Sequence, residues 1–307
     1  MEIQTLPTEC VLQHVNHRLL MRQHPLAIAS NTEEKPPSLR RGSDVLFFLV
    51  MGGISACFIL LIVLLLAADV MFSSPGEFYA ALAKPEIRAA MRLTIFSCTV
   101  AAILSVWVGT PLGYLLSRYS FPGRWLIDTL VDIPIVLPPL VLGLSLLILF
   151  HQPIFGGQIE SLFRDSIGFP ITYRWPAVVL AQFSVACAFS VRTMRVTFDQ
   201  MNPRAEEVAR TLGCTRGQAF WQIALPQAWR GVVTAFTIAW ARALGEFGPI
   251  LVFAGATRMR TEVLSTSVFL ELSIGNLDAA VAVSLLMVIL AVVVLLVLRG
   301  LGTGLTA

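Results

Sequence analysis

The sequence has little charge for its length: Asp, Glu, Lys and Arg make up 13% of its 307 residues, whereas 56% are hydrophobic. Ordinary soluble domains carry about twice that share of charge, so the composition predicts a protein whose main solvent is lipid. The formal net charge is only +3, and the arginines are dispersed along the chain. Nucleic-acid binding requires a basic stripe on one face, and this class of partner is therefore excluded.

Motifs for catalysis and metal binding are also missing. The chain has four His and five Cys, and it contains neither His-Glu-x-x-His nor Gly-x-Ser-x-Gly. Its two lysines, Lys35 and Lys84, each precede proline, so neither completes the glycine-rich loop that binds the phosphates of ATP. We predict no catalytic residue, no metal site and no cofactor bound by this chain.

Long apolar runs are what the sequence does contain. A transmembrane helix needs about 20 consecutive, mostly apolar residues, and six runs meet this requirement. The expected spans are about 45–68, 91–117, 126–150, 175–191, 232–254 and 277–298. Residues 1–44 have the composition of a disordered polar tail, and residues 45–302 form one membrane domain. The predicted fold class is an all-α polytopic membrane protein with six spans.

The distribution of arginine sets the expected orientation. Arg40 and Arg41 precede the first span, a basic turn occupies 118–124, and the polar stretch 192–230 carries more Arg than acidic residues. Basic residues concentrate on the cytoplasmic side of membrane proteins. This pattern predicts cytoplasmic amino and carboxyl termini.

Two spans contain residues that disturb a regular helix. Pro138 and Pro139 in the third span lack amide donors, so we expect that helix to bend or break. The fifth span contains Gly245, Gly248 and Pro249, which would let the helix loosen during transport.

The fifth span also places Arg242 and Glu246 four residues apart, on one helical face near the middle of the membrane. A central Arg costs about 2.5 to 3.5 kcal/mol there, so the two side chains should pair and face the interior of the bundle. Two interpretations stay open. The pair either fixes helix packing or helps to shape a transport pathway.

The stretch 202–226 predicts a short amphipathic helix on the cytoplasmic side. Asn202 can cap it, Pro203 suits its first position, and Glu206 and Glu207 lie near the positive end of its dipole. Periodicity alone is equally compatible with a plain connecting loop.

The sequence of this stretch resembles the signature loop of binding-protein-dependent ABC importer permeases. The matching residues are Glu207, Ala209, Gly213, Ile223, Leu225 and Pro226, and Val208 replaces the usual Ala. The resemblance implies a coupling helix that contacts a separate ATPase. In that family Glu207 would pair with a cation of the ATPase, Gly213 would permit a turn, and Pro226 would end the loop.

The run from Arg242 to Gly248 is similar to permeases for molybdate, tungstate and sulfate, and the resemblance extends over residues 89–298. It implies the type I importer permease fold, a homodimer in the cytoplasmic membrane of a prokaryote, two ATPase subunits that bind ATP and Mg, and an extracytoplasmic substrate-binding protein. Molybdate or tungstate is the expected substrate, with sulfate or thiosulfate as the alternative. Hydroxyls of Thr234 and Thr237 are further pathway candidates.

A secondary transporter driven by an ion gradient is the alternative from another class. It also uses broken helices and intramembrane acids such as Glu246. It has no need of the loop from Glu207 to Pro226.

Overall fold

The computed structural model describes residues 41–154, 157–168 and 170–303, and most of them are helical. The all-α membrane fold predicted from composition is therefore confirmed. Residues 1–40 of the expected polar tail lie outside the described residues. The chain divides into two units, residues 1–63 and 64–307, which we consider separately.

The described part of the first unit belongs to α2 (Arg41–Phe72), which continues into the second unit. Its segment Val45–Phe72 has a mean hydropathy of 2.9 and is long enough to cross a membrane. The helix continues past Asp69 to Phe72, four residues beyond the predicted first span.

The second unit is organised around three helices, α4 (Pro85–Arg118), α8 (Trp175–Gln200) and α12 (Trp229–Leu244). Their seams consist largely of small side chains, and a Cβ added to Gly109 would lie 2.6 Å from Ser190 Oγ. Lipid supplies little hydrophobic drive between helices, so close backbone approach is what holds such seams together. The central cluster is Cys98, Ala101, Ala102, Val179, Ala186, Ala239, Trp240, Ala243 and Leu244.

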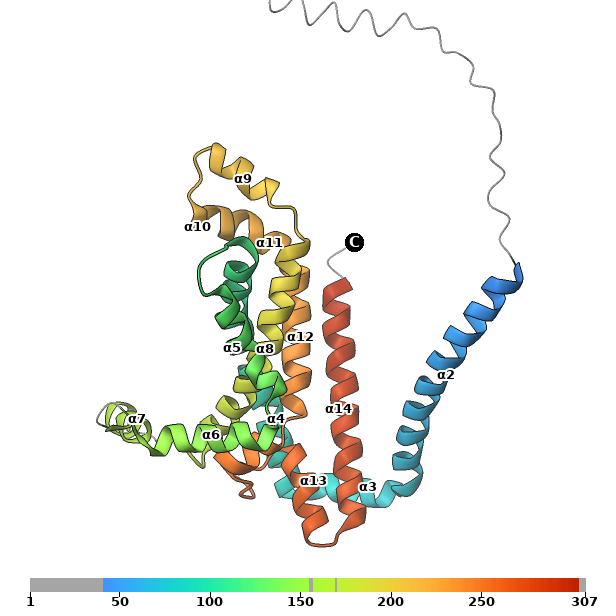
Figure 1. Cartoon of the computed structure of the whole chain (residues 1–307). Coiled ribbons are helices and arrows are strands. Elements are labelled where there is room, and N and C mark those ends of the chain that lie inside the picture. The colour runs from blue at the N-terminus through green and yellow to red at the C-terminus, as the bar shows by residue number, and fades with distance from the viewer. Residues whose placement is uncertain (1–40, 155–156, 169, 304–307) are drawn as a thin grey trace, which may run out of the picture. The chain divides into compact units, whose positions relative to one another are not determined.

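The predicted third span is broken, as its prolines indicated. Helix α5 (Arg124–Val136) packs against α8. Helix α6 (Pro139–His151) follows after a break and is bent by 113° relative to α5. Pro138 has extended backbone and Pro139 begins α6, because neither residue can supply an amide to a continuous helix. In Figure 1, α6 runs across the direction of α8 and α12. The geometry is that of a broken span or a re-entrant loop.

The predicted fifth span is also interrupted. Helix α12 ends at Leu244, residues 245–247 leave the helix, and a π-helical turn, η2 (Ile250–Ala254), follows Pro249. Among the described residues, four helices are long and apolar enough to span a membrane, and five if α5 and α6 form one span. The count of six spans stays a prediction.

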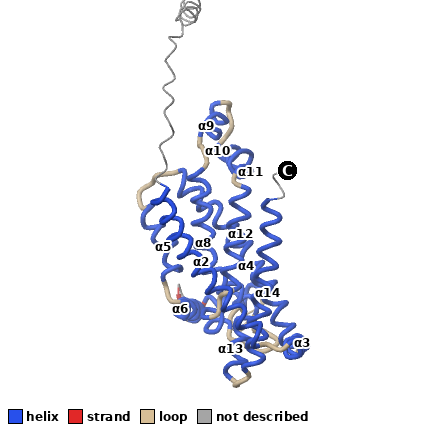
Figure 2. The backbone as a smooth tube through the Cα atoms, turned by 90° about the vertical axis from the view of Figure 1, so that its right-hand side faces the viewer, coloured by secondary structure: helices blue, strands red, loops and turns tan. Residues whose placement is uncertain are grey.

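The remaining elements lie at the two ends of the helices. A helical loop at one end contains α9 (Arg204–Thr211), α10 (Arg216–Ala219), the π-helical η1 (Phe220–Ala224) and α11 (Leu225–Gln227). At the opposite end lie α3 (Pro75–Ala83) and α13 (Leu264–Ser273), as Figures 1 and 2 show. Helix α14 (Leu277–Thr303) starts beside α13 and ends on the side of the loop. Residues 152–174 add the two-residue strands β1 (Pro153–Ile154) and β2 (Gly157–Gln158), which pair antiparallel, and α7 (Ile159–Ile167).

Candidate docking loop and transport pathway

The 202–226 loop begins with the helix that the sequence predicted. Asn202 Oδ1 accepts a hydrogen bond from the Arg204 amide at 3.0 Å, and Pro203 already has helical backbone angles. Asn202 therefore acts as the cap and Pro203 occupies the first helical position. This arrangement fixes where α9 starts relative to the end of α8.

Gly213 ends α9 in a left-handed conformation, with φ of +96°. The Cys214 amide donates to the Ala209 carbonyl and the Gly213 amide donates to the Arg210 carbonyl. These two bonds form the Schellman arrangement, which requires positive φ at the glycine position. The turn between the two short helices is thus located at Gly213, as the resemblance implied.

The second half of the loop starts with a reciprocal cap. Thr215 Oγ1 accepts from the Gln218 amide at 3.3 Å, while Gln218 Oε1 accepts from the Thr215 amide at 2.8 Å. The helix then widens into η1 immediately before Pro226, where a missing amide and a bulky ring disturb regular α-helical bonding. Pro226 lies inside α11 and the helical path continues through Ala228, so this proline does not itself end the loop.

The two adjacent carboxylates of α9 have different surroundings. Glu206 is buried, accepts a hydrogen bond from Tyr114 Oη at 2.6 Å and pairs with Arg118 at 3.1 Å. Glu207 is exposed, and its carboxylate makes no hydrogen bond or ion pair within the described part of the chain. The carboxylate that matches the family signature is therefore the one available to another molecule.

Large apolar side chains of this loop are exposed as well. Val208 is 57% exposed, Leu212 is 81% exposed, and Trp221 is 67% exposed. Ala209 is buried, while Ile223 and Leu225 are partly buried under the loop. An exposed apolar surface beside an unpaired carboxylate has the composition of a protein-docking surface.

The predicted pair in the membrane region is present. Arg242 Nη1 lies 2.5 Å from Glu246 Oε1, and the Glu246 side chain is 1% exposed. Arg242 also lies over the ring of Phe189, with its Cζ 5.7 Å from the ring centroid. Glu246 follows the end of α12, so the pair joins the helix to its break at 245–247.

The two interrupted helices are in contact at their breaks. A Cβ on Gly248 would lie 3.0 Å from the Leu140 amide nitrogen and 3.1 Å from Pro139 Cβ. A Cβ on Gly143 would lie 2.7 Å from Pro249 Cα. Pro139 of the predicted third span and Gly248 and Pro249 of the fifth thus lie at one junction between α6 and η2, although they are distant in the sequence.

The two threonine candidates lie in different surroundings. Thr234 lines an open groove between α8 and α12, near their ends beside the 202–226 loop, and its hydroxyl donates to the Arg230 carbonyl. Thr237 is partly buried and its hydroxyl donates to the Val233 carbonyl. The groove is lined by Arg192, Thr193, Val196, Thr197, Gln200, Met201, Gln227, Arg230, Gly231 and Thr234. Its threonine hydroxyls donate to backbone carbonyls and Arg192 pairs with Asp132. Arg230 and the amides of Gln200 and Gln227 are the groups of the groove that offer donors to an anion.

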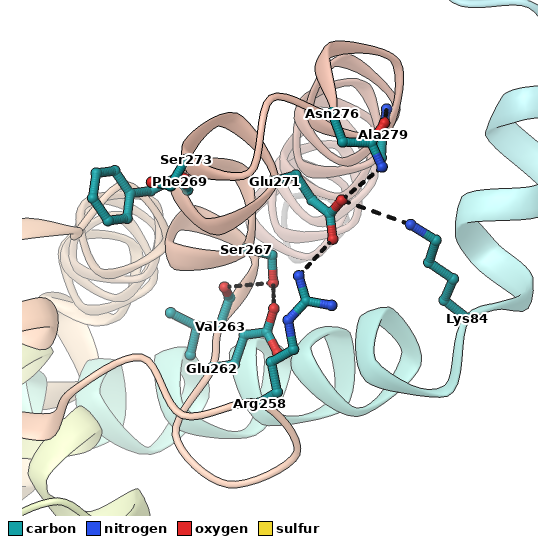
Figure 3. A network of polar contacts seen from close by, with 10 residues as sticks. All are labelled: Lys84, Arg258, Glu262, Val263, Ser267, Phe269, Glu271, Ser273, Asn276 and Ala279. Carbon is teal, nitrogen blue, oxygen red and sulfur yellow. Dashed lines mark hydrogen bonds and ion pairs between the residues drawn. The ribbon is translucent and has the colours of Figure 1, made fainter.

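A second polar group, which the sequence did not reveal, lies at the opposite end. We call it the distal cluster, and its members are Lys84, Arg258, Glu262, Ser267, Glu271 and Asn276. Figure 3 shows Glu271 at its centre, where the carboxylate receives Arg258 at 2.9 Å, Asn276 at 3.0 Å and Lys84 at 3.7 Å. Glu262 is buried beside it and accepts from Ser267 Oγ at 2.8 Å. Burial raises the pKa of the Glu262 carboxyl, and the hydrogen bond from Ser267 opposes this shift.

Sequence reasoning also missed the role of Glu206. It placed this residue only at the positive end of a helix dipole and treated Arg118 only as a mark of the cytoplasmic side. The available signal was the spacing of Tyr114 and Arg118, which lie one turn apart at the end of a span. Within the described ranges, no group of three or more His, Cys, Asp or Glu residues could hold a metal ion.

Apolar spanning helices, interrupted helices in contact and an exposed helical loop define a membrane transport subunit that works with other proteins. Residues 109–304 match the family of binding-protein-dependent transport system inner membrane components. Because the match covers more than half of the chain, the protein belongs to this family, and it is a multi-pass permease of a binding-protein-dependent ABC importer.

Individual relatives agree with this assignment. The chain is 35% identical over 208 residues to the sulfate transport system permease protein CysT of Escherichia coli (strain K12), covering 68% of this chain and 74% of that protein. It is 35% identical over 239 residues to a probable molybdenum ABC transporter permease protein of Haloferax volcanii, covering 78% and 84%. A bacterial alginate ABC transporter has a chain with the same fold, with a TM-score of 0.67 and 19% identity over 87% of this chain and 96% of that one.

Proposed function

We propose that this permease carries a tetrahedral oxyanion, with molybdate or tungstate as the expected substrate. Two copies of a separate ATPase subunit hydrolyse ATP with Mg, an extracytoplasmic binding protein delivers the anion, and two copies of this chain form the pathway between them. The carboxyl end of α14 and the 202–226 loop lie on the ATPase side, with both termini in the cytoplasm.

The surface of the 202–226 loop is the observation that carries this proposal. Two sets of caps fix its short helices, so Glu207 and the apolar side chains of Val208, Leu212 and Trp221 are presented on a defined framework. Exposed apolar side chains favour a protein partner, and the unpaired carboxylate of Glu207 favours a cation on that partner. An ATPase supplies the energy that this chain cannot obtain from ATP itself.

The membrane region supports passage of an anion. The junction of α6 and η2 places two breaks together, and irregular backbone at membrane depth is tolerated only in protein-buried or water-lined positions. The groove with Arg230, Gln200 and Gln227 adds a cation and two amide groups on the loop side of the bundle. Arg242 is balanced by Glu246, so this cation does not hold a passing dianion tightly.

Sulfate or thiosulfate is the second candidate substrate, and the similarity to a sulfate permease supports it. Molybdate, tungstate and sulfate share tetrahedral shape and double negative charge. Choice among them therefore rests mainly with the binding protein, and the permease is expected to accept the shape and charge that they share.

The test is transport by purified components in vesicles. The chain is reconstituted with its candidate ATPase and binding protein, and uptake of molybdate, tungstate and sulfate is measured with and without ATP. ATP-dependent uptake of one anion is expected. Uptake that an ion gradient drives without ATP would contradict the proposal and support the secondary transporter.

A further inference from the structure

The 202–226 loop is linked by polar side chains to one helix outside it, α4, among the residues that the structure describes. Tyr114 and Arg118 in the last two turns of α4 both bind the Glu206 carboxylate of α9. Arg118 Nη2 also donates to the Met201 carbonyl at 3.3 Å, just before the loop. The side chains of Arg118 and Glu206 are only 13% and 11% exposed, so water competes weakly for this pair.

The same end of α4 also contacts the second half of the loop. The Tyr114 ring lies 4.7 Å from the Phe220 ring, centroid to centroid, and Arg216 Cζ lies 5.6 Å from the centroid of the Tyr119 ring. A displacement of either short helix therefore meets side chains at the end of α4.

Helix α4 connects this end of the molecule with the distal cluster. Its 34 residues cover about 50 Å at 1.5 Å per residue. Near its other end, Thr94 Oγ1 accepts from the Leu264 amide at 2.9 Å, and Lys84, directly before α4, pairs with Glu271. Between the two ends, Gly109 and Gly113 pack closely on α8. A push on the loop end of α4 can therefore reach α13.

We propose that Glu206 is the positioning residue that transmits movement of the ATPase-docked loop to α4, and through α4 to the opposite side of the membrane. This inference rests on the proposed function. It gives the two adjacent carboxylates separate tasks: Glu207 contacts the ATPase, whereas Glu206 holds the loop to the helix that must move with it.

The test distinguishes loss of ATPase binding from loss of the transmission between the loop and α4. Glu206→Gln keeps the size of the side chain but removes its charge, and Tyr114→Phe removes one hydrogen bond while keeping the aromatic contacts. Glu207→Gln is the matched control, because it makes the same chemical change one residue away on the exposed side. Each variant is reconstituted with the ATPase and binding protein, and three quantities are measured: ATPase co-purification, ATP hydrolysis, and anion uptake per ATP hydrolysed.

We expect Glu206→Gln to retain ATPase co-purification and to lower uptake per ATP about tenfold, with a smaller reduction in Tyr114→Phe. Glu207→Gln should instead weaken co-purification while each assembled complex keeps its uptake per ATP. Wild-type uptake per ATP in Glu206→Gln and Tyr114→Phe would overturn the inference, and so would loss of ATPase co-purification in both. If Glu206→Gln does not insert, Tyr114→Phe decides alone. Absence of ATP-driven uptake in the wild type would contradict the proposed function itself.

Discussion

The 202–226 loop and the distal cluster lie at opposite ends of the helices and treat their carboxylates differently. In the loop, Glu207 is exposed and large apolar side chains have no cover. In the distal cluster, Glu262 and Glu271 are both buried, and Glu271 has three partners from the same chain. Buried carboxylates require internal partners, whereas an exposed carboxylate is solvated by water and remains available to another molecule. The difference agrees with the docking role proposed for the loop, whereas the carboxylates of the distal cluster are satisfied within the chain.

Removing the centre of the distal cluster should have the largest effect on stability. Glu271→Ala leaves Arg258, Lys84 and Asn276 without their shared acceptor. We expect it to lower the free energy of unfolding by about 3 kcal/mol, the lower end for a broken buried pair because two partners are partly exposed. Thermal unfolding in detergent measures this loss. The unfolding midpoint of Glu271→Gln should lie between those of Glu271→Ala and the wild type. An unchanged midpoint for Glu271→Ala would remove the contrast with the loop.

The ion pair of Arg242 and Glu246 tests whether internal partners also matter for transport. Glu246→Ala leaves Arg242 unpaired beside the break of the fifth span, and we expect ATP-driven uptake to fall by more than about tenfold. Asp69→Ala is the control, since Asp69 forms no ion pair among the described residues. Equal uptake by the two variants would favour a role of the Arg242 pair in packing alone.

Changing the turn of the loop should affect coupling more than stability. Gly213→Val forces a β-branched residue into positive φ, at a cost of about 1 to 2 kcal/mol, so the docking surface should lose its defined shape. We expect uptake to fall about tenfold, since about 1.4 kcal/mol corresponds to a factor of ten. Gly213→Asn is the matched control, because Asn tolerates this conformation better. Equal losses in both variants would show that backbone strain is not the cause.

The smallest effect concerns the pH dependence of the distal cluster. Burial raises the pKa of Glu262, with Arg258 lowering it and Glu271 and Glu86 raising it further. Between the ordinary value of 4.5 and the raised pKa, the folded protein holds a proton that the unfolded chain releases, so stability falls as pH rises through this range. Glu262→Gln stays neutral and keeps an amide oxygen for Ser267. Its unfolding midpoint should exceed that of the wild type by an amount that grows with pH, and a constant difference would contradict the burial argument.

Much of the local structure followed from the sequence because short-range chemistry specifies it. Prolines at 138 and 139 predicted the break between α5 and α6, since proline removes a helical hydrogen bond wherever it lies. Asn202 and Gly213 predicted the ends of α9 for similarly local reasons. The pairing of Arg242 with Glu246 followed from the cost of unpaired charge in a membrane.

The residues that the sequence could not place depend on contacts between distant segments. In the amphipathic helix α9, the apolar side chains of Val208 and Leu212 are exposed. The charged Glu206 is buried, because α4 presents Tyr114 and Arg118 at that position. The distal cluster joins Lys84 to residues 258–276 in the same way.

The sequence by itself determined the membrane solvent, the helix ends, the breaks and the signature of the docking loop, since each depends on composition or on residues a few positions apart. The tertiary structure alone decided which of two neighbouring glutamates is free, where the interrupted helices meet, and how α4 joins the loop to the distal cluster. Those properties arise from contacts between distant residues, such as Arg118 and Glu206, which are 88 positions apart, and Thr94 and Leu264, which are 170 positions apart. One sequence contains no direct signal for such contacts.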